Sequence, residues 1–407
     1  MSKKANHAIK YRLYPNKSQK EFFAKSFGCC RKIWNLMLAD KKESYEKTGS
    51  FSSQNPAFYK KEYPYLKEVD SLALANVQCS QNTAMNRFFK GISGFPNFKA
   101  KHKGRDSYTT NNQNGTVAMK ENGIRLPKIG VVKAKFHHFP SKGMVIKSAT
   151  VSRDRAGQYF CSLLFEYAAE DIPVKKVSSV EDAIGLDFSI RHMYVDSKGG
   201  IPDFSGQPDM EQTRRKIEKA QRKLSHRIQT HVTGYQAGRP VYNKKLSECK
   251  NVEKQRRKVA KLHKKLADQR EDFQHKLSNQ ITNDYGLICL EDISVKDLQL
   301  KKEQEPSAKK RRAVNRKLMD RAWYRFTVML DYKATKKGGR VIKVPKDYAS
   351  SQICHCCGEK NPEVKDIRVS RWRCPACGAE HDRDINAAIN IRNKGWEMAL
   401  SVAEQPA

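Results

Sequence analysis

The pattern of apolar and polar positions predicts a strand and then helices at the start of the chain. AIKYRL at 8–13 alternates apolar and polar residues, as in a half-buried strand, and the run ends before Pro15. Asn16 and Gln19 then form a capping signal for a helix, and helical spacing continues to about residue 90. We therefore expect one N-terminal strand followed by a helical segment.

Short strand patterns follow this helical segment. The stretch FPNFKAKHKGRDSY at 95–108 is basic and aromatic, and strand-like apolar residues recur over 123–136. Two further runs, at 144–152 and 158–167, are joined by the turn-like RDRAG. This part of the chain predicts a small β-barrel or sheet.

A different order of elements begins near residue 182: strand, hairpin, helices, strand, helix and strand. The apolar runs AIGLDFS at 183–189 and GLICLEDIS at 286–294 are typical of buried strands. RVIKVP at 340–345 supplies a third strand. Strands alternating with helices in this way predict a mixed sheet covered by helices.

The connections between these strands carry patterns of their own. Gly199 and Gly200 favour a turn that joins 193–197 to 200–204 as a hairpin. Residues 209–281 contain two long basic helical patterns, and these predict a helical hairpin. The chain breakers between the two helices are Gly234, Gly238 and Pro240. The apolar seams are Met210, Ile217 and Leu224 on one helix, and Val252, Val259, Leu266 and Phe273 on the other.

The segment KKEQEPSAKKRRAVNRK at 301–317 is interpreted as a charged loop. Such a charge run is usually only a solvated surface, but the overall charge of +36 and its position directly after the second buried strand leave nucleic-acid contact and a solvated surface as equal alternatives. An amphipathic helix is expected after it. Its inward side chains are predicted to be Met319, Ala322, Trp323, Phe326, Met329 and Leu330.

Composition narrows the class of partner. The 407 residues are 38% hydrophobic, which is enough to bury cores in two or three domains. Lys and Arg outnumber Asp and Glu by 79 to 43, so the formal net charge is +36, and this favours a polyanion such as nucleic acid over a membrane surface. The sequence has no run of 18 apolar residues, and its N-terminus lacks the apolar core of a signal peptide. We expect a cytoplasmic protein.

Four of the eleven cysteines form a metal-binding pattern. Cys354, Cys357, Cys374 and Cys377 have the spacing C-x2-C-x16-C-x2-C, which lets two knuckles converge on one tetrahedral zinc. A glycine follows each pair and supplies a tight turn. Four thiolates leave no open position for water, so we expect a structural zinc rather than a catalytic one. Cys356, inside the first pair, is either a free thiol or a substitute ligand.

Three carboxylates stand where buried strands or a helix meet a sheet edge. Asp187 lies in AIGLDFS, Glu291 ends the run LICLE, and Asp384 begins a predicted helix after the last cysteine. Each alone fits a structural role, as an ion-paired residue or a helix cap. Their order along the chain brings them to one edge of a mixed sheet. There a pair of divalent cations would relieve their repulsion and support phosphodiester hydrolysis, with Mg²⁺ the best suited and Mn²⁺ the alternative.

The same residues give the chain a resemblance to a known family. GLDFS, LICLEDIS, the SSQICHCCG and WRCPACG knuckles and HDRDINAAINI resemble TnpB, the transposon-encoded nucleases related to compact type V CRISPR effectors. YRLYPNKSQ and FPNFKAK are also similar to that family, so the resemblance covers almost the whole chain. Its most specific part is DRDINAA after a C-x-x-C pair. The additional Cys356 departs from the usual knuckle.

The resemblance implies a multidomain α/β fold. It comprises a RuvC-like, RNase H-type nuclease domain with a zinc ribbon, preceded by a β-barrel wedge domain with a helical recognition insert. The expected boundaries are 1–15 for the first wedge strand, 16–105 for the recognition domain, 106–180 for the rest of the wedge, 181–350 for the nuclease domain with its basic insertion 209–281, 351–380 for the ribbon and 381–407 for the last nuclease helix and tail.

The resemblance also implies an activity and its residues. It assigns Asp187, Glu291 and Asp384 as the catalytic metal ligands, with Asp384 rather than Asp382 as the third carboxylate. The implied activity is RNA-guided cleavage of DNA next to a short DNA motif that the protein itself reads. Guide RNA and target DNA are the expected partners, with no membrane and no obligatory protein partner, in a prokaryotic, nucleoid-associated setting.

Candidates for nucleic-acid contact follow from chemistry and position. Asn76 and Gln78 on the predicted helix at 71–89 offer the paired donor and acceptor that base edges require. Phosphate contacts are expected from the basic insertion. Its candidates are Lys219, Arg222, Lys223, Arg256, Arg257 and Lys261.

Two alternatives remain open. A DDE-like transposase would also use three carboxylates, a zinc module and a basic surface, but it normally carries a sequence-reading helix-turn-helix, and the sequence pattern indicates none. A catalytically silent guided repressor would be the interpretation if one carboxylate were replaced, yet all three are present.

Overall fold

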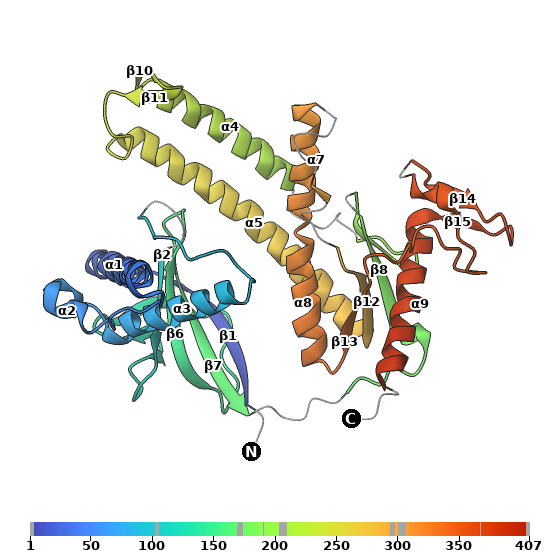
Figure 1. Ribbon diagram of the computed structural model, residues 1–407, viewed down its shortest axis with the longest axis horizontal. Helices are drawn as coiled ribbons and strands as arrows, with labels where there is room; N and C mark the ends of the chain where they lie inside the picture. The colour runs from blue at the N-terminus through green and yellow to red at the C-terminus, as the bar shows by residue number, and fades with distance from the viewer. Residues whose placement is uncertain are drawn as a thin grey trace. The chain divides into compact units, whose positions relative to one another are not determined.

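The computed structural model describes residues 4–101, 106–168, 174–189, 191–202, 210–293, 298–299, 307–366 and 368–403 (Figure 1). Its contacts define two compact units. The first comprises 1–170 and 222–261, and the second comprises 171–221 and 262–407. The predicted insertion at 209–281 is therefore divided between the units. None of the described helices is long and apolar enough to span a bilayer.

The first unit is built on a seven-stranded antiparallel sheet with the order β2-β6-β7-β1-β5-β4-β3. Its N-terminal strand β1 pairs with β7 from Lys4↔Ala168 to Leu13↔Tyr159. The predicted N-terminal strand thus lies inside the sheet. The strands are β1 (Lys4–Leu13), β2 (Asp106–Asn111), β3 (Ala118–Lys120), β4 (Gly123–Leu126), β5 (Gly130–Lys135), β6 (Val145–Arg153) and β7 (Tyr159–Ala168).

Helices pack against this sheet through one continuous apolar core. Asn16 and Gln19 form the expected capping box, with Asn16 Oδ1 accepting from Gln19 N at 2.9 Å and Gln19 Oε1 accepting from Asn16 N at 3.1 Å. The fully buried side chains of Tyr11, Phe23 and Phe165 belong to the core between the helices and the strands. The helices are α1 (Lys17–Thr48), α2 (Tyr59–Glu62), the 3-10 turn η1 (Pro64–Lys67) and α3 (Ser71–Phe89).

The second unit contains a four-stranded sheet with the order β13-β12-β8-β9. β12 runs parallel to both β8 and β13, whereas β9 is antiparallel to β8. The three buried strands predicted near 183, 286 and 340 are the three parallel strands observed. The bounds are β8 (Ala183–Ser189), β9 (Met193–Asp196), β12 (Leu287–Glu291) and β13 (Arg340–Val344).

Helices cover both faces of this sheet, since alternate residues of each strand point to opposite sides. Ile184, Leu186, Ile288 and Leu290 share one core with helix α8 (Trp323–Lys336), and Ala183, Leu287 and Cys289 share a second with α9 (Arg383–Ala403). Figure 1 shows α8 and α9 on either side of these strands. Burial on both faces explains why the strands are uninterrupted apolar runs.

The basic helical hairpin has a β-hairpin at its end. Helix α4 (Met210–Gln229) is followed by β10 (Val232–Gln236), β11 (Arg239–Tyr242) and α5 (Lys250–Asp284). Ala237 and Gly238 both have positive φ, at 47° and 72°, as two-residue hairpin turns require. The glycines that predicted a break in the helices therefore build strands and a tight turn (Figure 1).

The predicted hairpin at 193–204 is wrong in its pairing. β9 pairs with the preceding strand β8, from Leu186↔Asp196 to Ser189↔Met193. After β9 the Asp196 side chain accepts from Lys198 N and Gly200 N, both at 2.8 Å, and folds 196–200 into a compact turn. Ile201 and Pro202 lie outside any strand, and residues 203–209 lie outside the described part of the chain.

The predicted charged loop at 301–317 is largely a helix. Residues 301–306 lie outside the described residues, and α7 (Ala308–Arg321) covers the rest. Lys and Arg are good helix formers, so their charge was no argument for a loop.

The expected single amphipathic helix is interrupted at Ala322, which has φ 49° between α7 and α8. Met319 is 58% exposed, so its predicted inward position is wrong. The inward positions at Trp323, Phe326, Met329 and Leu330 are confirmed.

Two glycines let α9 lie directly on the sheet. A Cβ atom at Gly185 of β8 would overlap the carbonyl oxygen of Ala388 and lie 2.6 Å from Arg392 N on α9. A Cβ atom at Gly395 of α9 would overlap Cys289 Sγ on β12 and lie 2.7 Å from Cys289 Cβ. The helix backbone thus touches two adjacent strands where only hydrogen fits.

Gly185→Ala tests this close packing. Because the new methyl group meets backbone atoms that cannot rotate away, we expect the free energy of unfolding to fall by about 1–3 kcal/mol or more, measured by chemical denaturation. Gly28→Ala is the matched control. It lies within α1 with open space around its Cα, and we expect a gain of roughly 0.5–1 kcal/mol there. Equal effects of the two substitutions would contradict the packing described.

Candidate active site

Two of the predicted catalytic carboxylates lie on adjacent parallel strands, Glu291 at the end of β12 and Asp187 two residues before the end of β8. The pairing of β12 with β8 runs from Leu287↔Ala183 to Leu290↔Leu186. Asp187 and Glu291 each follow the last residue of this ladder, so they lie next to each other at the carboxyl ends of the strands. Ligands of open α/β sheets bind at this edge.

The third carboxylate is delivered by the N-terminus of α9. Helix α9 starts at Arg383, and Asp384 lies in its first turn. Asp382 has a different role, because its Oδ1 accepts from Asp384 N at 3.0 Å and from Ile385 N at 3.2 Å and so caps the helix. Asp382 is thus engaged as a helix cap, and the choice of Asp384 as the third ligand stays a prediction.

Electrostatics links the three carboxylates. Burial, followed by the charges of Asp384 and Glu291, raises the pKa of Asp187 well above its usual range, and Arg383 only partly opposes this. Burial also raises the pKa of Glu291, against a lowering effect of Lys346. Carboxylates in such surroundings favour protonation or a bound cation over bare ionisation. The fold therefore concentrates negative charge at one edge of the sheet.

The spacing of these carboxylates is wider than that of a single preformed ion site. Among the described residues, the groups of potential ligands whose donor atoms all lie within 4.8 Å of one another belong to the cysteine ribbon. Asp187, Glu291 and Asp384 do not form such a group. Their donor set is oxygen-only, which suits hard divalent cations that keep water ligands.

The four predicted cysteine ligands do converge. Their sulfurs lie within 4.8 Å of one another, with Cys354 Sγ 3.7 Å from Cys377 Sγ and Cys357 Sγ 3.6 Å from Cys374 Sγ. Each pair is followed by a glycine of positive φ, 80° at 358 and 74° at 378. The two turns are built alike, since Gly358 N donates to Cys354 O at 2.8 Å and Gly378 N to Cys374 O at 3.0 Å.

Backbone amides of the second knuckle point at sulfur. The N–H groups of Cys377 and Ala376 stabilise the Cys374 thiolate and lower its pKa to about 7, against the raising effect of burial. The pKa of Cys357 is lowered by the backbone N–H of Glu359 but raised overall to about 12 by its hydrogen bond with Cys377 and by burial. Without a cation the cluster thus holds protons on some sulfurs, and a bound cation would displace them.

A second set of donors overlaps the first. Cys354, Cys356 and His381 also lie within 4.8 Å of one another, and His381 Nε2 is 3.1 Å from Cys354 Sγ. Cys356 is exposed, while His381 is 4% exposed. The sequence predicted Cys356 as a possible substitute ligand, whereas His381 was not predicted.

Buried asparagines attach the ribbon to α9. Asn390 Nδ2 donates to Ser350 O at 2.8 Å and to Ile353 O at 2.6 Å. Asn386 Nδ2 donates to Ile353 O at 2.8 Å, while its Oδ1 accepts from His355 N at 3.1 Å. Both asparagines are nearly fully buried. They hold the first knuckle to the first and the following turn of the helix that presents Asp384, and neither was predicted from the sequence.

The base-reading candidates lie on α3, as expected, with unequal surroundings. Asn76 is half-buried, and its Nδ2 donates to Leu72 O of its own helix at 2.9 Å. Gln78 is also half-buried. A direct role in reading DNA bases stays a prediction for both.

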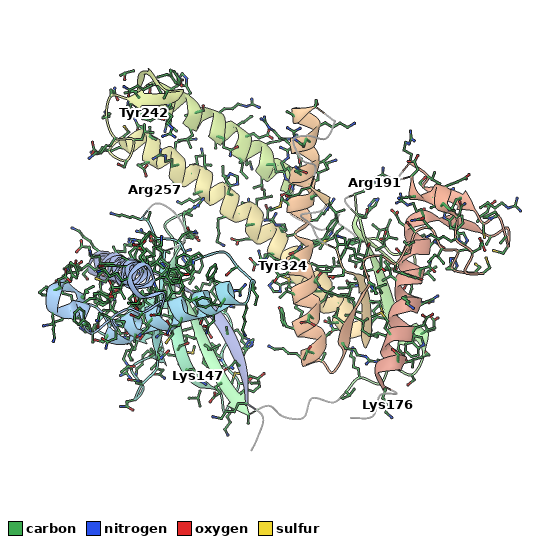
Figure 2. All side chains as sticks on the ribbon, in the orientation of Figure 1. Lys147, Lys176, Arg191, Tyr242, Arg257 and Tyr324 are labelled. Atoms are coloured by element: carbon green, nitrogen blue, oxygen red, sulfur yellow. The ribbon has the colours of Figure 1, made fainter. Side chains whose placement is uncertain are left out.

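The predicted phosphate contacts lie on the two basic helices (Figure 2). Arg256 is half-buried, and its Nη1 lies 2.6 Å from Glu253 Oε1 of the same helix. This ion pair partly neutralises its charge. The other five candidates are exposed, which keeps their charges available to a polyanion. They are Lys219, Arg222, Lys223, Arg257 and Lys261.

Asp187→Asn tests the electrostatic account of the site. Since the folded-state pKa of Asp187 is raised, the folded chain binds more protons than the unfolded chain, and ionisation of Asp187 costs stability as the pH rises above the ordinary carboxyl range. We expect the cation-free variant to melt a few degrees above the cation-free parent at about pH 7, and the gain to vanish near about pH 3.

Asp182→Asn is the control for this experiment. Backbone N–H groups of Ser178 and Ser179 lower the pKa of Asp182, so its stabilising effect is present above the ordinary carboxyl range and is lost as the pH falls. This variant should show no gain in melting temperature at neutral pH. A lower melting temperature for Asp187→Asn at neutral pH would refute the electrostatic account.

Most of the chain matches known protein families or relatives. Residues 165–302 match the profile described as "Probable transposase", and residues 323–391 match the "Cas12f1-like, TNB domain". Residues 1–50 match a profile described as "Helix-turn-helix domain". In this chain, however, the described part of that span contains the strand β1 and the single 32-residue helix α1.

A protein of Streptomyces pristinaespiralis named "Putative RNA-guided DNA endonuclease" is 30% identical over 97% of this chain and 90% of its own length. An Escherichia coli protein named "Putative RNA-guided DNA endonuclease InsQ" is 26% identical over 95% of this chain and 92% of its length. A solved Cas12f1–sgRNA–target DNA complex aligns with a TM-score of 0.53 at 12% identity, covering 96% of this chain and 99% of that one, and so supports the fold alone. The chain belongs to the TnpB family.

Proposed function

We propose that this protein is an RNA-guided DNA endonuclease that hydrolyses phosphodiester bonds at Asp187, Glu291 and Asp384. The observation that carries the proposal is the meeting of these three carboxylates at one sheet edge in a chain of the TnpB family. They come from β8, β12 and α9, which lie far apart in the sequence. A cluster of mutually repelling carboxylates is costly for folding, and such costs are characteristic of catalytic sites.

Divalent cations fit the oxygen-only donor set of this edge. Mg²⁺, or Mn²⁺ in its place, would be held by the three carboxylates, and such ions activate water and stabilise the leaving oxygen of a phosphodiester. The role of the chain is to fix the donors. β8 and β12 hold Asp187 and Glu291 in register, while the cap at Asp382 fixes the first turn of α9 and hence the backbone of Asp384.

RNA and DNA are the proposed partners. The net charge of +36 and the exposed cations on α4 and α5 supply phosphate contacts that do not depend on base sequence. Pairing between a guide RNA and the target would then supply the specificity, a division of labour known for another class of guided effector. Recognition of a short DNA motif by Asn76 and Gln78 belongs to the same proposal.

The cysteine ribbon is proposed to bind one structural zinc through Cys354, Cys357, Cys374 and Cys377. Four sulfur donors at convergent positions favour zinc and leave no coordination site for water. The ribbon's contribution to cleavage is then mechanical, because Asn386 and Asn390 join it to the helix that carries Asp384.

The domain roles are proposed on the same basis. The β8–β12–β13 sheet with its flanking helices corresponds to a RuvC-like, RNase H-type nuclease domain. The seven-stranded sheet with α1 to α3 corresponds to the wedge and recognition domains, with the boundaries expected from the sequence.

A DDE-like transposase is the second candidate, because one matching profile is described as "Probable transposase" and another as "Helix-turn-helix domain". The sequence-reading motif that such an enzyme normally uses does not occur in residues 4–50 as described, where a single long helix follows the strand β1. Strand joining in the absence of RNA would favour this candidate.

Cleavage assays on carboxylate variants test the proposed chemistry. Purified complex of the chain with its native guide RNA should cut matched DNA in Mg²⁺. Asp187→Ala, Glu291→Ala and Asp384→Ala should each reduce the rate by a factor on the order of 10⁴, because one cation loses a ligand. DNA binding should persist.

Asp382→Ala is the matched control within the same turn of α9. Loss of its cap should cost about 1 kcal/mol of stability and leave cleavage within a few-fold of the parent. If Asp382→Ala were inactive while Asp384→Ala cut normally, the assignment of the third carboxylate would be wrong.

Metal analysis tests the ribbon. We expect about one zinc per chain, and we expect Cys374→Ser to lose it together with local stability, because metal binding is coupled to folding of the ribbon. Cys356→Ser is the control and should retain zinc. Loss of zinc from Cys356→Ser with retention in Cys374→Ser would instead favour the overlapping set that includes Cys356 and His381.

A further inference from the structure

An arginine-lined cavity lies in the second unit, apart from the carboxylates. Its volume is about 540 Å³, within the range of small-molecule sites. α4, α5, α7 and the start of β9 contribute to it. Among the residues that the structure describes, five basic residues and one acidic residue line it, so this part of the lining is positively charged. They are Arg191, Arg214, Arg270, Lys317 and Arg321, with Asp320 as the acid.

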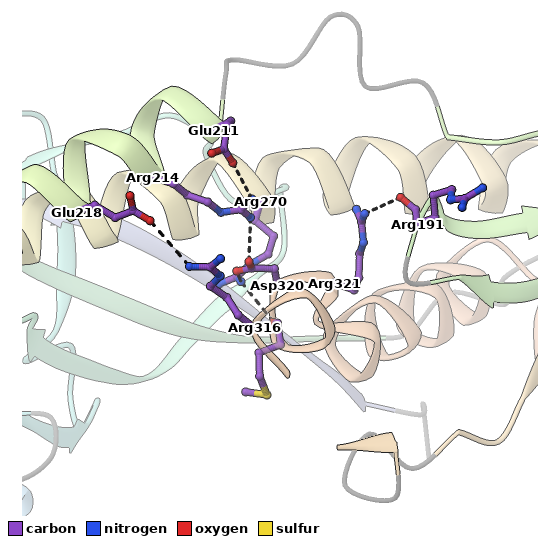
Figure 3. A network of polar contacts seen from close by, with 9 residues as sticks. Arg191, Glu211, Arg214, Glu218, Arg270, Arg316, Asp320 and Arg321 are labelled. Carbon is purple, nitrogen blue, oxygen red and sulfur yellow. Dashed lines mark hydrogen bonds and ion pairs between the residues drawn. The ribbon is translucent and has the colours of Figure 1, made fainter. Parts of the chain in front are cut away.

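Asp320 holds two of the arginines in place. Its Oδ2 lies 2.9 Å from Arg214 Nη2, and its Oδ1 lies 3.3 Å from Arg270 Nη1 (Figure 3). Arg321 is turned toward the loop before β9, where its Nη2 donates to Arg191 O at 2.6 Å. Burial and the nearby charge of Arg214 lower the pKa of Arg321. Glu211 Oε2 also lies 3.5 Å from Arg214 Nη1 (Figure 3). These two carboxylates do not balance the basic residues that line the cavity, so an anion would be stabilised there.

The remaining lining of the cavity is apolar, which distinguishes it from a simple phosphate site. The half-buried Met210 and Leu266 form the accessible apolar wall, and Met193 and Phe273, 2% and 5% exposed, lie behind it. A flat aromatic base packs well on such a wall beside arginine planes. The cations match the phosphate of a nucleotide, and the apolar wall matches its base.

A buried acceptor without a partner also lines the cavity. Gln274 is 1% exposed, and its Nε2 donates to Arg321 O at 2.7 Å. Its Oε1 is buried and has no hydrogen-bond partner among the residues that the structure describes. Leaving such an oxygen unpaired costs free energy. Because the oxygen is buried behind the cavity wall, a ligand would meet it only if the Gln274 side chain turned.

Two residues with unusual backbone conformation border the same place. Met193 has φ 75° and Ala322 has φ 49°, a region that non-glycine residues seldom adopt. The carbonyl of Met193 accepts from Trp323 Nε1 at 2.9 Å, which holds it there. Backbone strain of this kind is often retained at ligand sites.

We propose that this cavity binds a single nucleotide turned out of a nucleic-acid strand, with its phosphate among the arginines and its base on the wall that Met210 and Leu266 present in front of Met193 and Phe273. The proposal rests on the proposed function only for the source of the strand, which is the guide RNA or the target DNA. Unlike the phosphate contacts on the outer faces of α4 and α5, this contact would include the base.

Titration of the RNA-free, full-length chain with nucleoside 5′-monophosphates tests the site independently of cleavage. We expect each nucleotide to bind more tightly than inorganic phosphate or the free nucleoside. The double variant Arg191→Ala/Lys317→Ala should weaken binding by roughly tenfold or more, since two cations at the exposed rim are lost. Both residues are exposed, so folding should be unaffected.

Lys310→Ala is the matched control, because it removes an exposed lysine from the same helix α7 outside the cavity. Its nucleotide affinity should equal that of the parent. Equal loss in Lys310→Ala and in the double variant would overturn the proposal, and so would phosphate binding as tightly as the nucleotides.

Crosslinking identifies the strand. Complexes are irradiated with 4-thiouridine placed singly along the guide RNA, or with 4-thiothymidine placed along the target DNA. A crosslink to the peptide containing Met193 or Phe273 in either arm supports the site and names its source. Absence of such a crosslink at every position of both strands would overturn the proposal, even if guided cleavage itself were normal.

Discussion

The contact of α9 with β8 and β12 is the constraint on which the candidate active site depends. Glycine at 185 and at 395 lets the helix backbone touch two adjacent strands, two residues before Asp187 and Glu291 respectively. The helix starts only a turn beyond this contact, so the first turn that carries Asp384 has little freedom to move away. Backbone contact thus converts two strands and a distant helix into one carboxylate cluster.

The cluster works against the stability of the fold that creates it. Burial and mutual repulsion raise the pKa of Asp187, so its ionised form is disfavoured without cations. Repulsion between the carboxylates would push them apart. The ribbon opposes this movement, because buried hydrogen bonds from Asn386 and Asn390 attach its first knuckle to the helix that carries Asp384. The cysteine ribbon and Asp384, seven residues after Cys377, are therefore mechanically connected through one helix.

Sequence patterns predicted the structural features that local residue chemistry determines. The three buried strands, the cap at Asn16 and the convergence of the four cysteines all followed from apolar runs, side-chain donors or ligand spacing. Two local features were misread, since charge at 308–321 suggested a loop although basic residues favour helices, and β9 pairs with the strand before it rather than with residues after the glycines. The arginine cavity was missed because it depends on long-range packing and gathers residues from four separate elements. The base-reading residues on α3 stay predictions because their surroundings alone do not define a partner.

Changing the guide is the most direct test of the central claim that this chain cuts DNA where an RNA directs it. The chain would be purified with its native guide scaffold carrying a new targeting segment, and incubated in Mg²⁺ with DNA containing either the old or the new target beside the same flanking motif. The account predicts that cleavage moves entirely to the new target and disappears in Asp384→Ala. Continued cutting at the old target, or equal cutting by RNA-free protein, would contradict it.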